Sequence, residues 1–153
     1  MDILLQFLIL GAFIAGVVAL YKFLVSRAGG NPWYVWGVRV TLIGAFLLFW
    51  VNGAVGIIGH ADNDANMLYG VVFVVGALIA GITRFRAMGM VAALGGMAVA
   101  QALVPAIAVA AQVDLTTHWS ADMVWLTAFW CAIWAGGALL FRRAGALELR
   151  ADV

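Results

Sequence analysis

Five long apolar runs constrain this chain more than any other feature of its sequence. They cover residues 3–25, 35–58, 67–83, 88–111 and 123–141. A helix needs roughly 20 apolar residues to cross the hydrocarbon core of a bilayer, with a range of about 17–25. Each run meets this requirement, and 67% of the 153 residues are hydrophobic. A compact soluble domain of this length cannot bury so much apolar surface, so we expect the surplus to face lipid.

The breaks between these runs are short and polar, which is typical of hairpin connections between neighbouring helices. Strand-like alternation is absent, and backbone groups in lipid must find their hydrogen bonds within their own segment. We therefore predict an all-α integral membrane bundle of five transmembrane helices in a single domain over residues 1–153. Residues 1–33 would add an amino-terminal helix and turn to a four-helix core over residues 34–143. Residues 144–153 would form a short cytoplasmic tail.

The charged residues are divided between the two ends of this predicted bundle. All eight basic residues fall on alternate connections, and so on one side: Lys22, Arg27, Arg39, Arg84, Arg86, Arg142, Arg143 and Arg150. The other side holds five aspartates and no basic residue: Asp2, Asp62, Asp64, Asp114 and Asp122. The positive-inside rule then predicts an amino terminus outside and a carboxyl terminus in the cytoplasm. A chain of four or six spans would break this alternation, so the charges independently favour five.

A few polar side chains lie within the predicted spans. At about 1.5 Å per residue, Asn52 lies roughly 9 Å and Gln101 roughly 15 Å from the outer ends of their spans. On the same scale Thr127 lies at roughly 6 Å and Cys131 at roughly 14 Å. These depths predict one intramembrane polar locus shared by the second, fourth and fifth helices. It could line a path for a small solute or ion, but hydrogen bonding between helices, worth about 0.6 kcal/mol per bond, is the favoured interpretation.

Small residues and deep tryptophans are expected to pack these helices together. Gly96 and Ala100 recur four residues apart on the fourth predicted helix. Such spacing lets helix backbones approach closely, either within one chain or between copies. Three tryptophans are expected to pack against neighbouring helices rather than stack on a cofactor: Trp50, Trp130 and Trp134.

Both histidines lie on the side that carries the aspartates. His60 and Asp62 share the loop before the third span, and Asp114 and His118 lie four residues apart before the fifth. Imidazole and carboxylate groups are suitable ligands for zinc, copper or another divalent ion. The sequence therefore allows an external cation site formed by these four residues. Their spacing matches no recognised metal signature, and the favoured alternative is that these loops are simply polar and cap the helices that follow.

Several short segments between Trp50 and Arg143 form a recognisable series. They are a glycine-rich GAVGIIG stretch, an acidic DN turn, an NMLY helix start, a basic RFR turn, an AQAL helix and a final ALLFRR. In this series the chain resembles a group of small uncharacterised bacterial inner-membrane proteins. The resemblance implies a bacterial inner-membrane location and supplies no activity or catalytic residue. The first predicted span lies outside it, which implies that this helix is an addition to the core.

Together these features favour a structural or interaction subunit of the membrane. No nucleophile–base pair and no acid within a span is evident, so we expect no enzyme activity and no cofactor. A proton-coupled transporter would need an ionisable group within the membrane. The alternative function is a small oligomeric channel or a metal-linked transporter. Expected partners are membrane lipids and either a second copy of the chain or another membrane protein. Nucleic acid is excluded, because only 10% of the residues are charged.

Overall fold

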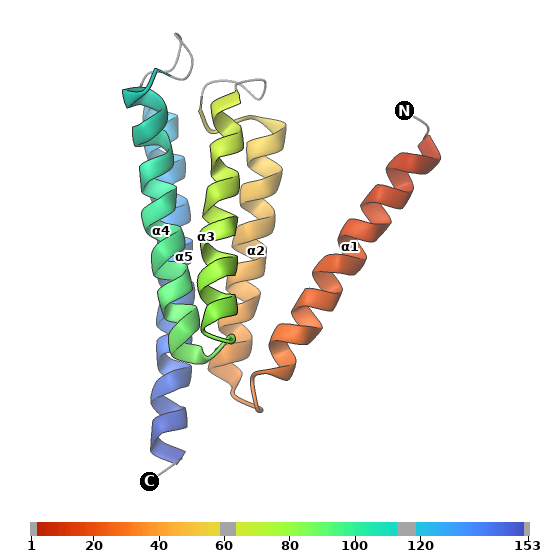
Figure 1. Ribbon diagram of the computed structural model, residues 1–153, viewed down its shortest axis with the longest axis vertical. Coiled ribbons are helices and arrows are strands. Elements are labelled where there is room, and N and C mark those ends of the chain that lie inside the picture. Colours follow the sequence, from red (N-terminus) through yellow and green to blue (C-terminus); the bar gives the residue numbers. More distant parts are fainter. Residues whose placement is uncertain (1–2, 59–63, 113–118, 152–153) are drawn as a thin grey trace.

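The computed structural model describes residues 3–58, 64–112 and 119–151, with the backbone alone for residues 3–10, 13 and 151. This part of the chain is built from helices (Figure 1). They are α1 (Ile3–Ser26), α2 (Pro32–Ala54), the 3₁₀ helix η1 (Asp64–Tyr69), α3 (Gly70–Ile82), α4 (Ala87–Ala110) and α5 (Ala121–Ala151). By length and composition, four segments can cross a membrane: Pro32–Ala54, Asp64–Ile82, Ala87–Ala110 and Ala121–Arg150. A fifth span, formed by α1, stays a prediction.

The second helix lies a few residues earlier than predicted. It begins at Pro32 because the Asn31 side chain accepts a hydrogen bond from the Trp33 N–H at 3.1 Å, and proline fits the first helical position. It ends at Ala54 rather than at residue 58. Just beyond this end, Gly56 adopts a φ of 78°, a left-handed conformation that glycine reaches without strain. The predicted end at residue 58 is therefore wrong.

The last helix is longer than predicted. α5 continues through Ala151, so most of the predicted tail over residues 144–153 is helical. Alanine, leucine, glutamate and arginine dominate this stretch, and all are strong helix formers. The Asn31 amide also donates a hydrogen bond to the Ala144 carbonyl at 3.1 Å, which attaches this part of α5 to the start of α2. The predicted end at residue 141 reflects the loss of hydrophobicity, which ends a span and not a helix.

The third predicted span combines two kinds of helix. η1 passes directly into α3 at Gly70. With about 2.0 Å of rise per residue in the 3₁₀ segment and about 1.5 Å in α3, the two together extend for about 32 Å. A hydrocarbon core is about 30 Å thick, so the combined segment is long enough to cross it.

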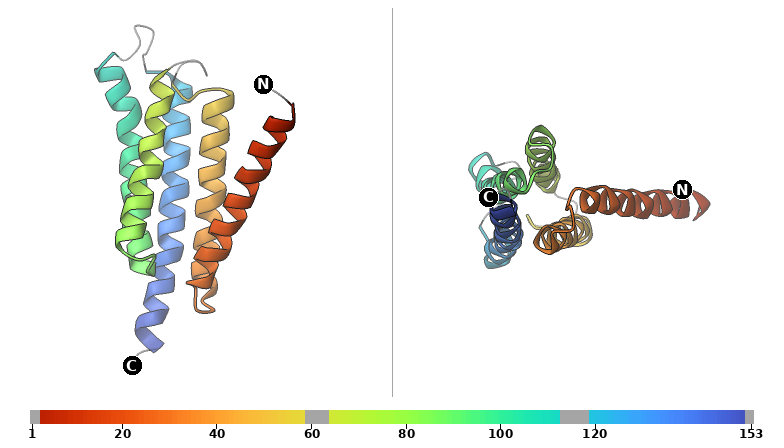
Figure 2. Two further views of the ribbon diagram at one scale, coloured as in Figure 1. Left: turned by 45° about the vertical axis from the view of Figure 1, so that its right-hand side comes forward. Right: turned by 90° about the horizontal axis from the view of Figure 1, so that it is seen from below.

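Four of the helices form an antiparallel bundle, and α1 stands apart from it. α5 packs against both α2 and α4, and α4 packs against α3 (Figures 1 and 2). α1 meets the bundle only near its carboxyl-terminal end and then diverges from α2. We call α2, η1, α3, α4 and α5 the four-helix core.

Glycines set the close approach of the core helices. A Cβ added to Gly37 of α2 would lie 2.9 Å from the Phe141 ring of α5. A Cβ added to Gly96 of α4 would lie 2.7 Å from Ile79 of α3. Both distances are too short for a real contact, so a larger residue would force the helices apart. Gly96 therefore has the packing role that the small-residue pattern predicts.

The tryptophan predictions are correct for two of the three residues. Trp130 and Trp134 are fully buried in the core. The Trp130 indole N–H donates to the Gly44 carbonyl of α2 at 3.1 Å. Trp50 is 59% exposed, and its ring lies beside that of Phe46 on the same helix, at 6.0 Å between centroids. Its predicted packing between helices is wrong, because it lies on the outer face of α2.

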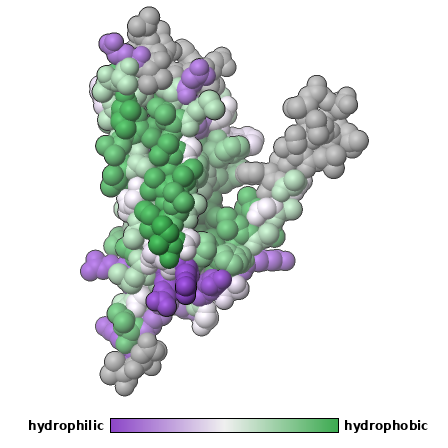
Figure 3. Space-filling model, in the orientation of Figure 1, coloured by the Kyte–Doolittle hydropathy of each residue, from purple (hydrophilic) through white to green (hydrophobic). Residues whose placement is uncertain are grey.

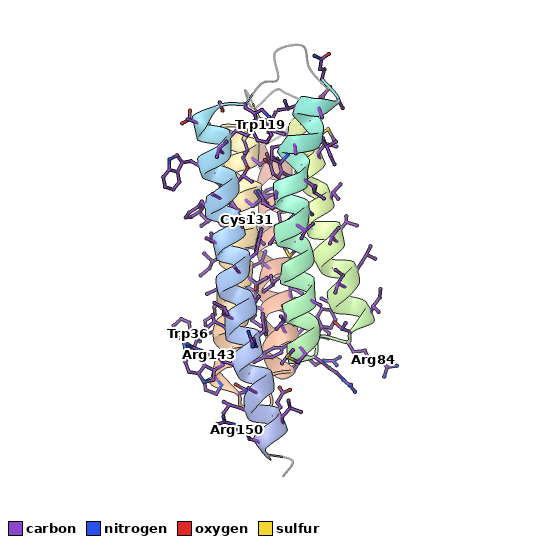
Figure 4. All side chains as sticks on the ribbon, turned by 90° about the vertical axis from the view of Figure 1, so that its left-hand side faces the viewer. Trp36, Arg84, Trp119, Cys131, Arg143 and Arg150 are labelled. Atoms are coloured by element: carbon purple, nitrogen blue, oxygen red, sulfur yellow. The ribbon has the colours of Figure 1, made fainter. Side chains whose placement is uncertain are left out.

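The surface carries a broad apolar band between two polar ends (Figure 3). Large apolar side chains are exposed on every α-helix, among them Ile14, Ile43, Val74, Val99 and Leu139. The basic residues gather at the end where α1 and α3 finish and α2 and α4 begin, and Figure 4 places Arg84, Arg143 and Arg150 there. Trp119 lies at the opposite end, near the start of α5. This surface is compatible with a multi-pass membrane protein.

Candidate functional site

The predicted external cation site falls on residues whose positions are not described. His60, Asp62, Asp114 and His118 all lie outside the described residues. Within residues 3–58, 64–112 and 119–151, no group of three or more histidines, cysteines, aspartates or glutamates is arranged to hold a metal ion. The cation site therefore stays a prediction from the sequence.

The predicted intramembrane locus lies in described residues, and its first member is hydrogen bonded. The Asn52 side chain donates from Nδ2 to the carbonyl oxygen of Asn66 at 2.9 Å. Asn66, in η1, is itself buried and accepts at Oδ1 from the backbone N–H groups of Ile57 and Ile58 at 3.0 and 2.9 Å. Its Nδ2 donates to the Ile58 carbonyl at 3.3 Å. One amide side chain thus satisfies three backbone groups of the segment that follows α2.

The sequence indicates Asn66 only as the first residue of the NMLY helix start and not as a member of the polar locus. This residue lies at the start of the third run, where an asparagine is most simply interpreted as part of a polar loop. The useful signal is Gly56, because a glycine there indicates that the helix ends before the polar loop. The backbone groups that follow such an end need hydrogen-bond partners. A buried amide nearby is the expected solution. This hub of Asn52 and Asn66 fixes the α2–η1 connection.

Gln101, the second member, is fully buried and unpaired. Its exposed fraction is 0%, and neither Oε1 nor Nε2 makes a hydrogen bond. A buried polar group without a partner costs about 1–3 kcal/mol. No hydrogen bond among the described residues joins Gln101 to Asn52. The interhelical bonding that the sequence favoured for the locus is therefore made by Asn52 and not by Gln101.

Thr127 and Cys131 lie close to Gln101 in height along the bundle. The Cys131 thiol donates to the Ala98 carbonyl of α4 at 3.5 Å, so Cys131 and Ala98 lie at the same level along the bundle. From this level, Gln101 lies about 4.5 Å and Thr127 about 6 Å along their helix axes. Both lie toward the acidic end, because the two helices are antiparallel. The structure thus brings three predicted locus residues within about one helical turn.

Two further polar side chains belong with this locus. Tyr69, at the end of η1, is buried and its hydroxyl lies beside that of Thr127, although no well-formed hydrogen bond joins them. Trp134, two turns along α5 from Thr127, is also buried with an unpaired indole N–H. Both were missed because aromatic residues in an apolar run are usually assigned to packing. We call Asn52, Tyr69, Gln101, Thr127, Cys131 and Trp134 the core polar cluster.

The chemistry of the core polar cluster is that of hydrogen bonding. Five of its six members hold at least one buried polar atom without a partner, namely Asn52, Tyr69, Gln101, Thr127 and Trp134. Amides, hydroxyls and an indole can donate to or accept from a small polar solute, but they are poor general bases near neutral pH. The cluster therefore offers donors and acceptors to which a small polar solute could bind.

Comparison with models of protein families, with curated proteins and with solved structures finds no match for this chain. The resemblance of residues 50–143 to small bacterial inner-membrane proteins stays a prediction from the sequence.

Proposed function

We propose that this chain is a multi-pass protein of the bacterial inner membrane that serves as an interaction subunit. In this proposal the four-helix core anchors the chain, and α1 docks a transmembrane helix of a partner. Four long apolar helices and the separation of charge between the two ends support the membrane setting. The carboxyl terminus and the turn between α3 and α4 would face the cytoplasm, and α1 would be the fifth span.

The divergence of α1 from the core is the observation that carries this proposal. Leu24 and Ala28, at the junction with the core, are buried. Toward the amino terminus the described side chains become exposed, and Ile14 reaches 53%. A Cβ added to Gly11 or Gly16 would meet nothing within 4 Å. Among the described residues, the outer half of α1 therefore makes no close contact with another helix at Gly11 or Gly16.

The sequence of α1 suits contact with another helix. Gly11, Ala15 and Ala19 recur every four residues and so share one face of the helix. All three are exposed. Small residues at this spacing allow two membrane helices to approach closely, and van der Waals contact then drives their association. The partner would be a transmembrane helix from a second copy or from another membrane protein.

Bulky substitutions on this face test the proposal. Gly11→Ile with Ala15→Ile should block close approach without touching the core, whereas Ala77→Ile with Ala102→Ile adds the same bulk to exposed positions of α3 and α4. Proteins are cross-linked in native membranes, and the complexes are purified through a tag on this chain. Co-expression of copies that carry two different tags shows whether a complex contains a second copy. The α1 variant should lose complexes that the control variant retains. Equal recovery from both variants would contradict the docking role of α1.

The core polar cluster favours a second candidate, a small channel or transporter. Unpaired polar atoms on helices α2, α4 and α5 are costly in a dry bundle unless a polar solute meets them. If the cluster lines a path, liposomes holding the protein should pass small monovalent cations, and Gln101→Leu should abolish this flux while the protein remains folded. Absence of flux in the wild-type chain would remove this candidate.

The metal-linked form of that candidate depends on the outer loops. Elemental analysis of the purified chain should then find about one divalent ion per chain, bound through imidazole and carboxylate groups. Replacing both histidines, as His60→Ala with His118→Ala, should remove the ion. Metal that survives this double substitution would exclude these residues as ligands.

We also propose that the chain is not an enzyme. The core polar cluster, as described, offers amide, hydroxyl, indole and thiol groups and holds no carboxylate or imidazole that would act as a general base. Incubation of the purified protein with model ester and phosphoester substrates should give the background rate of hydrolysis.

A further inference from the structure

An open cavity of about 350 Å³ lies at the basic end of the bundle. Three arginines line it: Arg27, which follows α1, and Arg84 and Arg86, which belong to the turn between α3 and α4. We call these three residues the basic corner. Arg27 lies far from Arg84 and Arg86 in the sequence, so the fold has to bring it beside them around one cavity.

The turn that carries two of these arginines is held in an uncommon conformation. Arg84 and Phe85 have φ values of 53° and 57°, in the left-handed region that residues other than glycine rarely adopt. The Phe85 ring packs edge-on against Phe23 of α1, with 5.3 Å between centroids. Its carbonyl accepts a hydrogen bond of 2.6 Å from the hydroxyl of buried Tyr34 in α2. Such backbone conformations persist where the surrounding structure fixes them, and here the fixation places Arg84 and Arg86 beside the end of α1.

The guanidinium charges of the basic corner have no paired carboxylate among the described residues. Within the described residues, none of its three guanidinium groups forms a salt bridge or a side-chain hydrogen bond. Arg27 lies over the Phe23 ring at 4.9 Å, a contact that leaves its N–H donors available. Glu148 of α5 is the one acidic residue among the described residues that line the cavity, so the three arginines and this glutamate together carry a net charge of +2. This positive charge favours the binding of an anion.

The surroundings of the basic corner favour an anion that carries an apolar chain. Arg84 and Arg86 also line a second cavity, of about 390 Å³, whose other walls include Ile82 and Met88. These two side chains are 80% and 55% exposed, on the apolar surface of α3 and α4. A phosphate held by the arginines would thus have an apolar surface directly beside it. Basic pockets between helices at the cytoplasmic side of a membrane are suited to anionic lipid head groups.

We propose that the basic corner binds one phosphate group, supplied by the head group of an anionic phospholipid whose acyl chain lies along Ile82 and Met88. Guanidinium groups match phosphate oxygens in geometry and charge, and bidentate pairing is common between them. The amino terminus of α4, which begins at Ala87 in the cavity wall, adds backbone N–H groups that also favour an anion. The proposal is independent of any role of α1 in docking.

Native mass spectrometry of the full chain in detergent micelles tests this proposal. With phosphatidylglycerol and phosphatidylcholine supplied in equal amounts, one phosphatidylglycerol should be retained preferentially. The corner variant, R27Q/R84Q/R86Q, should bind it on the order of a hundredfold more weakly, at roughly fivefold for each arginine near the membrane surface. Unchanged retention in this variant would overturn the proposal.

A matched variant separates a site from general attraction to the basic end. R142Q/R143Q/R150Q removes the same charge from the same end of the bundle but from residues that do not line the cavity. Figure 4 shows Arg84 and Arg143 on different sides of the bundle. This control should weaken binding by less than about threefold, because general attraction is spread over many charges. An equal loss in both variants would overturn the proposal.

Glu148→Gln provides a test that leaves every arginine in place and does not depend on whether the corner variant folds. Removing the one acidic group from the lining should tighten phosphatidylglycerol binding by about fivefold. Unchanged or weaker binding would count against the site. Inorganic phosphate and glycerol phosphate, added at millimolar concentration, should not displace the lipid. If these compounds displace the lipid from the wild-type chain but not from the corner variant, the basic corner binds phosphate, and its ligand is a soluble phosphate ester and not a lipid.

Discussion

α1 and the four-helix core are similarly apolar in sequence and differ in what their helices contact. In the core, Gly37 and Gly96 each face a side chain from a neighbouring helix, whereas Gly11 and Gly16 of α1 face nothing. In water such an exposed helix would be strongly disfavoured, but in lipid its apolar side chains lose nothing by exposure. The difference teaches that hydropathy places a helix in the membrane, while small residues and polar groups decide what it packs against.

The two regions also differ in their polar content. The core holds a hub of Asn52 and Asn66, which hydrogen bonds η1 to the end of α2, and buried polar groups around Gln101 that lack hydrogen-bond partners among the described residues. The described side chains of α1 between residues 11 and 20 are all apolar or glycine. Polar contacts therefore give the core a unique arrangement that the outer half of α1 lacks.

The largest effect is expected at the hub of the core. Asn66→Leu would leave the N–H groups of Ile57 and Ile58 unpaired, and at about 1–3 kcal/mol for each buried group we expect a loss of about 3 kcal/mol in the free energy of unfolding. Asn52→Leu removes a single hydrogen bond and should cost about 1 kcal/mol. Reversible unfolding in mixed detergent micelles measures both. A loss below that of Asn52→Leu would show that Asn66 does not organise the end of α2.

The next effect contrasts a glycine of the core with a glycine of α1. Gly37→Leu must displace the Phe141 ring, which is itself fixed edge-on against Tyr34 at 4.9 Å. Overpacking of this kind costs about 1–3 kcal/mol. Gly16→Leu adds the same side chain where nothing lies within 4 Å, and it should change stability by less than about 0.5 kcal/mol. If the Gly16 variant loses as much as the Gly37 variant, α1 is packed as tightly as the core.

No loss of stability is expected at Gln101, and this result distinguishes the two candidate functions. Leucine has a similar volume and removes two unpaired polar atoms, so Gln101→Leu should leave the free energy of unfolding unchanged or raise it by about 1 kcal/mol. The same variant is assayed for cation flux in liposomes. A loss of about 1–2 kcal/mol would mean that the amide is hydrogen bonded to a neighbouring helix. Its coupling to Asn52 could then be measured in the Asn52→Ala background.

The sequence predicts the helices of the core well, because each needs a long apolar run and the polar turns between them are short. It predicts their ends less well. α2 ends where Gly56 adopts a left-handed conformation and Asn66 hydrogen bonds the backbone that follows. α5 continues past residue 141 because helix formation does not require hydrophobicity. These ends depend on local hydrogen bonds, about which average hydropathy carries no information.

The candidate site was predictable only in part. Asn52, Gln101, Thr127 and Cys131 could be found from the sequence because polar residues stand out within apolar runs. Tyr69 and Trp134 could not, since their polar atoms belong to residues whose rings are mostly apolar. The divergence of α1 could not be predicted either. It depends on the absence of contacts along one helix, and in a membrane an apolar sequence is compatible with both a packed and an unpacked position.

Cysteine cross-linking within single chains tests the separation of α1 from the core most directly. In a chain with Cys131→Ala, the pair Gly44→Cys with Ile133→Cys joins α2 to α5, where a Cβ on Gly44 lies 2.5 Å from the Ile133 side chain. The pair Gly11→Cys with Trp50→Cys probes the outer halves of α1 and α2, which Figure 1 shows far apart. Oxidation in native membranes should close the first pair within a chain and leave the second open or joined only between chains. Rapid closure of the second pair within one chain would show that α1 packs along α2, and would contradict the account.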